Sequence, residues 1–199
     1  LDKETNVAVD QSGSKNHGVI RGTTQTTTGD CTALDFAEER DVVSFPDPYA
    51  GAFDGEEFSL VVRGTVPEGS GPQTLWAYTS LHVGRRLAAR WDGDDGGWVF
   101  SLAGTGDRIQ ADVGSSLEPG DEFQLTLTYT AGDGFAIYEN GTRRTQVRDV
   151  GSVYHEVCFL TLGGTLPCQY SWMGTTNTVG VFQTALSGEE LTQLNEDIC

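Results

Sequence analysis

Arginine and aromatic side chains are the residues of this sequence best suited to holding a ligand. Two stretches carry them at alternate positions, with Trp76 and Tyr78 in the first and Arg86 and Arg90 in the second. Alternate side chains of a strand share a face, so each pair points to one side. Aromatic rings stack on sugar rings, and guanidinium groups hold hydroxyl and carboxylate oxygens. The four residues predict an outward ligand patch if the residues between them face a core. The alternative inverts the first strand and buries Trp76 and Tyr78.

Hydrolysis of a glycosidic bond needs two carboxyl groups at a fixed separation. The nearest approach to such a pattern is Glu39-Arg40-Asp41, where a further carboxylate is missing. The three histidines are scattered and have no nucleophile at a recognisable spacing; they are His17, His82 and His155. We therefore predict no catalytic residues and no enzyme activity. A hydrolase or lyase whose carboxylates come from different strands is the open alternative.

The acidic balance of the chain limits its partners. The 199 residues include 12 Lys and Arg against 29 Asp and Glu, for a net charge of −17. Such a field repels nucleic acid and anionic membranes, and no apolar run approaches the roughly 20 residues that span a bilayer. We expect neither nucleic-acid binding nor membrane insertion. Only Lys3 and Lys15 are lysines. With the acid excess, this is typical of halophilic or extracellular proteins, so we expect salt to raise stability by screening carboxylates.

The four cysteines form an even set without a C-x-x-C pair; they are Cys31, Cys158, Cys168 and Cys199. Zinc sites favour two close pairs, so two disulfides and an oxidising compartment are the better interpretation. Of three possible connectivities we expect Cys158–Cys168, closing a local loop, and Cys31–Cys199, tying the C-terminus to an early strand. Four buried free thiols are the alternative. Because Leu1 is not an initiator methionine, we expect a processed chain or an excised domain.

Alternating polarity predicts the elements that would position these residues. In Phe123–Thr130 every odd-numbered residue is apolar and every even-numbered one is polar, which is typical of a strand with one solvent-facing side. Similar stripes follow Phe58–Val62, Leu87–Trp91, Trp98–Leu102 and Cys158–Leu162. Many short strands without a proline-rich linker predict an all-β fold, an antiparallel β-sandwich in which residues 1–199 form one domain.

Two local motifs refine this fold. Asn140-Gly141 predicts a type I′ hairpin turn between two strands. Asn140-Gly141-Thr142 is also a sequon, so Asn140 is a candidate for glycosylation. Ser187 and Glu190 have the spacing of a capping box, which predicts one short C-terminal helix.

Several segments, taken in order, resemble the laminin-G-like domains of the concanavalin A-like superfamily. Asp10–Gly18 resembles their D-x-S-G-x-x-N-x-G opening, and Glu57–Val62 resembles a strand that begins with an acid and Phe. Phe123–Gly141 resembles their strand and Asn-Gly hairpin, and Gly174–Leu191 resembles their closing strand and helix start. The resemblance covers most of the chain and implies a jelly-roll arrangement of the sandwich.

This resemblance also implies a binding role at a cell surface, often around structural Ca²⁺. The positions that correspond to the family's metal-side residues are Asp10 and Asn177, and Asn16 adds a further oxygen. Calcium prefers carboxylate, amide and carbonyl oxygens. Because Asn177 stands where the family has an acid, we expect weakened calcium binding there. The alternative is a loop held by local hydrogen bonds.

Taken together, the sequence predicts an extracellular, non-catalytic module at a cell or virion surface that recognises a glycan or a cell-surface protein. Two alternatives from other classes stay open. One is a glycan-cleaving hydrolase or lyase of the same fold. The other is a structural or assembly domain of an adhesin, surface layer or virion spike.

Overall fold

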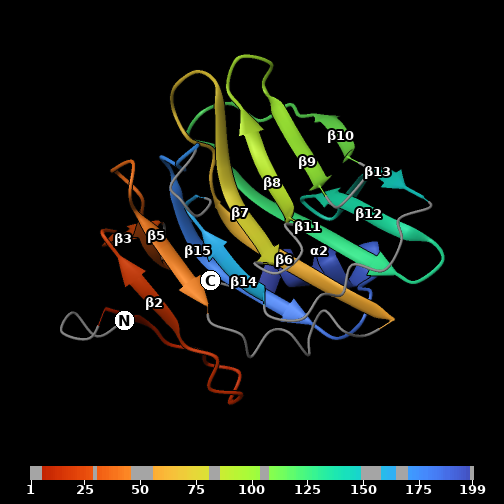
Figure 1. Ribbon diagram of the computed structural model, residues 1–199, viewed down its shortest axis with the longest axis horizontal. Helices are drawn as coiled ribbons and strands as arrows, with labels where there is room; N and C mark the ends of the chain where they lie inside the picture. The colour runs from red at the N-terminus through yellow and green to blue at the C-terminus, as the bar shows by residue number, and fades with distance from the viewer. Residues whose placement is uncertain are drawn as a thin grey trace.

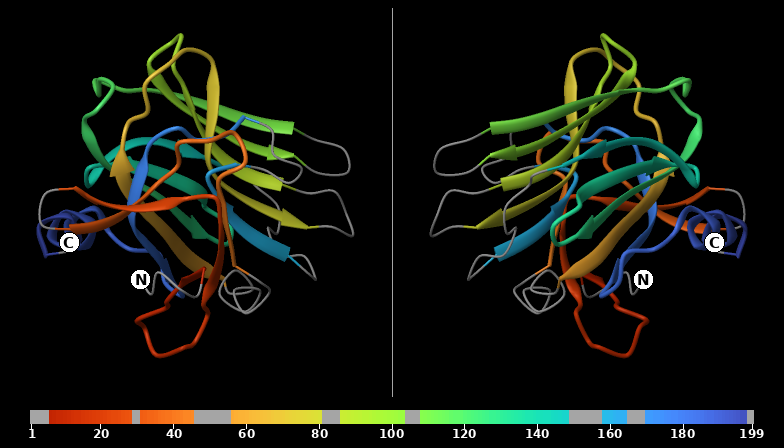
Figure 2. Two further views of the ribbon diagram at one scale, coloured as in Figure 1. Left: turned by 90° about the vertical axis from the view of Figure 1, so that its left-hand side faces the viewer. Right: turned by 90° about the vertical axis from the view of Figure 1, so that its right-hand side faces the viewer.

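The computed structural model describes residues 6–28, 31–45, 56–80, 86–103, 108–148, 158–164 and 170–197. Over these ranges the chain forms two sheets in which every described strand pair is antiparallel. The sheets lie face to face as two layers (Figures 1 and 2). The structure is therefore an antiparallel β-sandwich with one short helix near the C-terminus, as the alternating pattern predicts.

The first layer is an eight-stranded sheet with the order β1-β2-β5-β14-β7-β8-β9-β10. In that order its strands are β1 Val7–Ala8, β2 Gly18–Arg21, β5 Val42–Phe45, β14 Cys158–Leu162, β7 Pro72–Ser80, β8 Arg86–Asp92, β9 Gly97–Ala103 and β10 Arg108–Gly114. The second layer is a seven-stranded sheet with the order β13-β12-β11-β6-β15-β4-β3. Its strands are β13 Thr142–Val147, β12 Gly134–Glu139, β11 Glu122–Thr130, β6 Glu57–Thr65, β15 Thr175–Phe182, β4 Cys31–Asp35 and β3 Thr24–Thr28.

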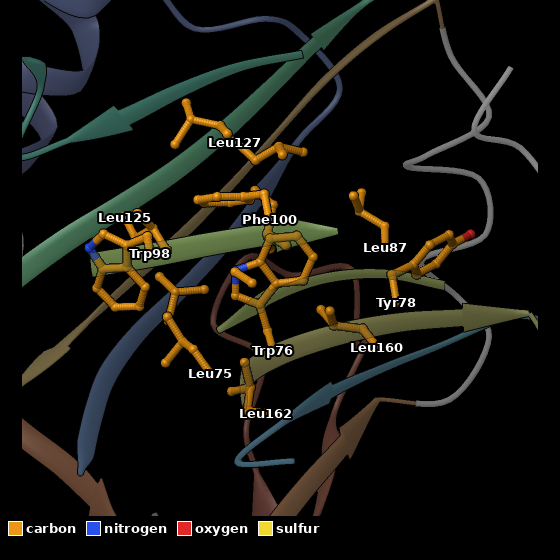
Figure 3. Close-up of a cluster of buried hydrophobic side chains, with 14 of the residues drawn as sticks. Leu75, Trp76, Tyr78, Leu87, Trp98, Phe100, Leu125, Leu127, Leu160 and Leu162 are labelled. Carbon is orange, nitrogen blue, oxygen red and sulfur yellow. The ribbon is translucent and has the colours of Figure 1, made fainter. Parts of the chain in front are cut away.

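The core lies between the two layers and is rich in aromatic side chains (Figure 3). Trp98 is at its centre: its ring stacks on Trp172 at 6.1 Å and meets Phe123 edge-on at 4.9 Å. Trp91 adds a second edge-on contact with Trp98 at 5.1 Å. Such aromatic pairs add about 0.5–1.5 kcal/mol each beyond burial of their area.

A β-bulge in β7 corrects the expectation that Trp76 and Tyr78 point outward. In the pairing with β8, Thr74 lies opposite Arg90 and Trp76 lies opposite Ala89, so Leu75 is an extra residue. A bulge breaks strict alternation, and both Leu75 and Trp76 enter the core, where Figure 3 shows them side by side. After the bulge the alternation resumes, which buries Tyr78 as well. The sequence alternative, with both aromatic residues in the core, is the correct one.

The polar side of β11 is also not the solvent-facing surface that its alternation suggests. Gln124, Thr126 and Thr128 are all buried. The C-terminal segment covers this side, because the Gln124 side-chain amide donates to the carbonyl oxygen of Leu191 at 2.9 Å. Leu191 belongs to α2, Gly188–Asp197. Period-two alternation describes the two sides of a strand, but it does not reveal which distant segment covers one of them.

The two local motifs form as predicted. Asn140 and Gly141 have φ angles of 50° and 75°, which the type I′ turn requires. At the start of α2 the Glu190 carboxylate accepts the Ser187 N–H at 2.8 Å, and Ser187 Oγ accepts the Glu190 N–H at 3.3 Å. This reciprocal pair is the capping box. In the part of the chain that the structure describes, no helix has the length and apolar character needed to cross a membrane.

Candidate functional site

The outward side of the eight-stranded sheet carries the only cation of the predicted patch whose side chain is described. Arg90 alternates on β8 with Ala89 and Trp91, which face the core. Cross-strand pairing places Arg90 between Thr74 of β7 and Val99 of β9. These three side chains therefore form one row across the outward side. The expected outward orientation of Arg90 agrees with this register.

Tyr170 lies against Arg90 and completes the row. The guanidinium carbon of Arg90 is 5.7 Å from the centre of the Tyr170 ring, within the range of a cation–π contact. The Tyr170 carbonyl oxygen accepts the Thr74 N–H at 2.6 Å, which holds this loop residue against β7. Thr74, Arg90, Val99 and Tyr170 are called the outer patch below.

Tyr170 combines an unusual backbone conformation with a solvent-exposed side chain. Its φ angle is +58°, in the left-handed region that non-glycine residues seldom occupy. At the same time it is 48% exposed. Strained backbone of this kind often accompanies binding sites, since the surrounding structure must hold it in place. The arrangement presents an aromatic surface beside a cation, which suits a sugar ring with polar substituents.

Arg90 has no carboxylate partner among the described residues, although the protein has a net charge of −17. Its Nε atom and the Thr74 Oγ1 atom are buried and have no hydrogen-bond partner. Among the described residues an ion pair joins Arg144 to Glu139, and none joins a carboxylate to Arg90. A buried donor without a partner costs about 1–3 kcal/mol.

The remaining residues predicted for the ligand patch do not all join it. Trp76 and Tyr78 belong to the core, as the β7 bulge explains. Arg86 starts β8 and has the same parity as Arg90, but its side chain lies outside the described residues. The outer patch therefore keeps one predicted member, Arg90, and gains Thr74, Val99 and Tyr170.

Of the predicted calcium residues, Asp10 makes local hydrogen bonds, and Asn177 belongs to a different sheet from the strand that follows Asp10. The Asp10 carboxylate accepts the N–H groups of Ser12 and Asn16, each at 2.8 Å. The Ser12 side chain and these backbone bonds hold the pKa of Asp10 below its usual value. Asp10 precedes β2 in one sheet, whereas Asn177 lies on β15 in the other. This geometry favours the loop held by local hydrogen bonds, and calcium at Asp10, Asn16 and Asn177 stays a prediction.

No group of three or more His, Cys, Asp or Glu side chains within the described ranges could hold a metal ion. Asp41, from the segment that most resembles a catalytic carboxylate pattern, has a structural role. Asp41 is buried, and its carboxylate accepts the N–H groups of Ala37 and Glu38, each at 2.9 Å. His17 accepts the N–H of Asp10 through Nδ1 at 3.0 Å, whereas His82 and His155 lie outside the described residues.

The predicted disulfides and glycosylation site lie partly outside the described residues. Cys31 is disulfide-bonded. Cys168 and Cys199 lie outside the described residues, as does the side chain of Cys158, so the two expected pairings stay predictions. Asn140 is exposed at its hairpin turn, and its side-chain oxygen accepts the Gln124 N–H at 2.7 Å. Its glycosylation also stays a prediction.

Sequence reasoning missed a buried carboxylate at the other end of the core. Glu139 of β12 is 5% exposed and lies on the core side, because it alternates with the buried Ile137. One carboxylate oxygen accepts the Trp98 indole N–H at 2.9 Å and the Ser115 hydroxyl at 2.5 Å. The other oxygen is 3.6 Å from the Arg144 guanidinium. Four groups thus form one polar network against an aromatic core.

Comparison with solved structures identifies the kind of fold. Domain 4 of a GH43 extracellular arabinanase from Geobacillus stearothermophilus, in complex with arabinotriose, matches 88% of this chain and 82% of its own, with a TM-score of 0.73 and 14% identity. The botulinum neurotoxin serotype G binding domain matches 94% of this chain and 48% of its own, with a TM-score of 0.73 and 12% identity. A Trypanosoma rangeli sialidase matches 98% of this chain and 31% of its own, with a TM-score of 0.73 and 16% identity.

The fold is a jelly-roll β-sandwich. At these identities the likeness concerns the fold alone. The chain spans about a third of the sialidase and about half of the toxin domain. No family model matches the chain, and no curated protein matches it in sequence. The laminin-G-like resemblance therefore stays a prediction, while the broader fold class is confirmed.

Proposed function

We propose that this protein is a non-catalytic glycan-binding module and that the outer patch receives the sugar. The observation that carries this proposal is Arg90, which lies against the exposed ring of Tyr170 and has no carboxylate partner among the described residues. A sugar ring would stack on Tyr170, and its oxygens would accept hydrogen bonds from the guanidinium. Thr74 is buried beneath the patch, and its backbone N–H holds Tyr170 in place.

The fold supports the proposal without determining it. The arabinanase domain of the same fold type is in complex with arabinotriose, and a botulinum neurotoxin type C that matches this chain interacts with ganglioside molecules. Both contacts belong to those proteins. By analogy, we infer for this chain an extracellular, laminin-G-like module of one domain that recognises a glycan or a glycosylated cell-surface protein.

A glycan array with the intact protein tests the proposal, with and without added Ca²⁺. For each glycan bound, titration calorimetry compares the wild type with Tyr170→Ala and Arg90→Gln. We expect each variant to bind about tenfold more weakly, which equals about 1.4 kcal/mol. Arg21→Gln is the matched control, because Arg21 is exposed at the end of β2 in the same sheet. Thermal unfolding of each variant checks that the fold is intact.

Two outcomes would overturn the proposal. One is the absence of binding to any glycan at millimolar concentration. The other is glycan binding that Tyr170→Ala and Arg90→Gln leave unchanged. Release of new reducing ends from a polysaccharide panel would instead favour the hydrolase alternative. A calcium requirement for binding would support the calcium prediction, and equal binding in the presence of a chelator would count against it.

A further inference from the structure

A second β-bulge interrupts β13, the edge strand of the seven-stranded sheet, beside two neighbouring arginines. In the hairpin of β12 and β13, Tyr138 pairs with Arg143 and Ile137 pairs with Thr145, so Arg144 is an extra residue. In a regular strand, neighbours such as Arg143 and Arg144 point to opposite sides. Bulges change the direction of a side chain and are common beside functional sites. Here both arginines line the same groove.

The groove lies where the edges of the two sheets approach each other. β10 ends the eight-stranded sheet, β13 ends the seven-stranded sheet, and the two strands lie side by side (Figure 1). The groove has a volume of about 370 Å³, which is within the usual range for small-ligand sites. Its lining residues are Asp112, Val113, Gly114, Thr142, Arg143, Arg144 and Thr145.

Arg144 is fixed in this groove by contacts with both sheets. Its Nη2 group donates to the Gly114 carbonyl oxygen of β10 at 2.8 Å. Its guanidinium also lies 3.6 Å from the Glu139 carboxylate, which Trp98 and Ser115 hold in place from the core. Arg144 therefore has a defined position before any ligand arrives, which reduces the entropy lost on binding.

Arg143, by contrast, is free to bind. Its side chain is exposed and makes no hydrogen bond or ion pair with another residue of the described ranges. Charged residues on edge strands commonly prevent pairing with other chains, and this explains one charge on β13. It does not explain two neighbouring arginines that both line one groove.

We propose that this groove is a second ligand site and that it takes a carboxylate-bearing sugar residue, such as a hexuronic acid. Arg143 would hold the carboxylate. Asp112 would accept hydroxyl hydrogens, and the hydroxyl groups of Thr142 and Thr145 would complete the contacts. Only Val113 among the lining side chains is apolar, so the groove fits a polar sugar without a stacking ring. Glu139 already pairs with Arg144, so Arg143 is the cation that remains for the carboxylate of the ligand. Asp112 disfavours a ligand with a high density of negative charge.

The test is an NMR titration of the intact, isotope-labelled protein with trigalacturonic acid, and in parallel with the neutral galactotriose at matched ionic strength. We expect resonances of residues 112–114 and 142–145 to shift with the acidic trisaccharide and not with the neutral one. Arg143→Gln should weaken this binding at least fivefold. Arg148→Gln is the matched control, because Arg148 is an exposed arginine just beyond the end of β13 and outside the groove lining.

Three results would refute the proposed groove site. The absence of shifts at the groove residues with 10 mM trigalacturonic acid would overturn the proposal. Equal weakening by Arg143→Gln and Arg148→Gln would also overturn it, because the effect would then be general charge attraction. Loss of uronate binding in Tyr170→Ala, but not in Arg143→Gln, would place the acidic sugar on the outer patch. That result would refute the groove site and leave the proposed glycan-binding function standing.

Discussion

Removal of the Glu139 carboxylate tests whether the buried polar network stabilises the sandwich. Glu139→Ala leaves the Trp98 indole N–H without its acceptor, and Trp98 is 0% exposed, so water cannot replace the lost partner. A buried donor left without a partner costs about 1–3 kcal/mol. The half-buried Ser115 hydroxyl loses the same acceptor, and Arg144 loses its ion pair. Together these losses predict a decrease of about 3 kcal/mol in the free energy of unfolding.

The assay is chemical denaturation followed by tryptophan fluorescence, together with thermal unfolding. For a chain of this size, about 3 kcal/mol corresponds to a decrease of about 6–12 °C in Tm. Glu122→Gln is the control: Glu122 is exposed at the start of β11, and its substitution should change stability by less than about 0.5 kcal/mol.

A double-mutant cycle makes the test specific to the indole contact. Once Trp98→Phe has removed the donor, adding Glu139→Ala no longer creates an orphaned N–H group. The two substitutions should therefore be non-additive by about 1 kcal/mol or more. If Glu139→Ala costs less than about 0.5 kcal/mol, or if the two effects simply add, the buried network does not carry the stability assigned to it.

Three further predictions concern charge and packing. Thermal unfolding between low and molar salt should show Tm rising, because the net charge is −17 and salt screens carboxylate repulsion; a flat or falling Tm would contradict this. Since hydrogen bonds lower the pKa of Asp10 in the folded state, its stabilisation is present above about pH 4 and is lost as pH falls. Asp10→Asn should therefore flatten the acid limb of stability measured by urea denaturation between pH 5 and pH 2, whereas an unchanged slope would refute the assignment. Gln124→Ala should lower the free energy of unfolding by about 1–2 kcal/mol, because it removes the buried bond to α2; Gln146→Ala, at an exposed position on β13, is the control.

The sequence predicted the elements well where the local chemistry leaves little choice. The Asn140-Gly141 turn and the Ser187–Glu190 capping box depend on a few adjacent residues, and both form as expected. The strand stripes also form, because burial of one side requires period-two alternation in a sandwich. The buried polar side of β11 was missed, since the covering segment lies more than 50 residues further along the chain.

The candidate site was harder to predict, because its composition depends on register. Strict alternation assigns Leu75 and Trp76 to opposite sides, and a single extra residue in β7 brings both into the core. No residue type in this stretch marks the bulge. Glu139 is different: it shares the parity of Phe135 and Ile137, a signal of core-side burial that the sequence analysis did not use. The contact between Arg90 and Tyr170, which are 80 positions apart, could come only from the fold.

The two proposed sites lie on one route across the molecule. From Arg90 on β8 the outward row continues through Val99 on β9 to Asp112 on β10, which already lines the groove. Two steps between strands of about 4.8 Å each separate Arg90 from Asp112 by about 10 Å. An extended acidic oligosaccharide could therefore contact both sites at once, and linked contacts raise affinity by raising effective concentration. In a chain with 29 acidic residues, Arg90 and Arg143 have no acidic partner in the described ranges, and both lie along this route. Asp112 lies on the same route, so this surface suits a ligand whose carboxylate contacts Arg143 while its hydroxyl groups contact Asp112.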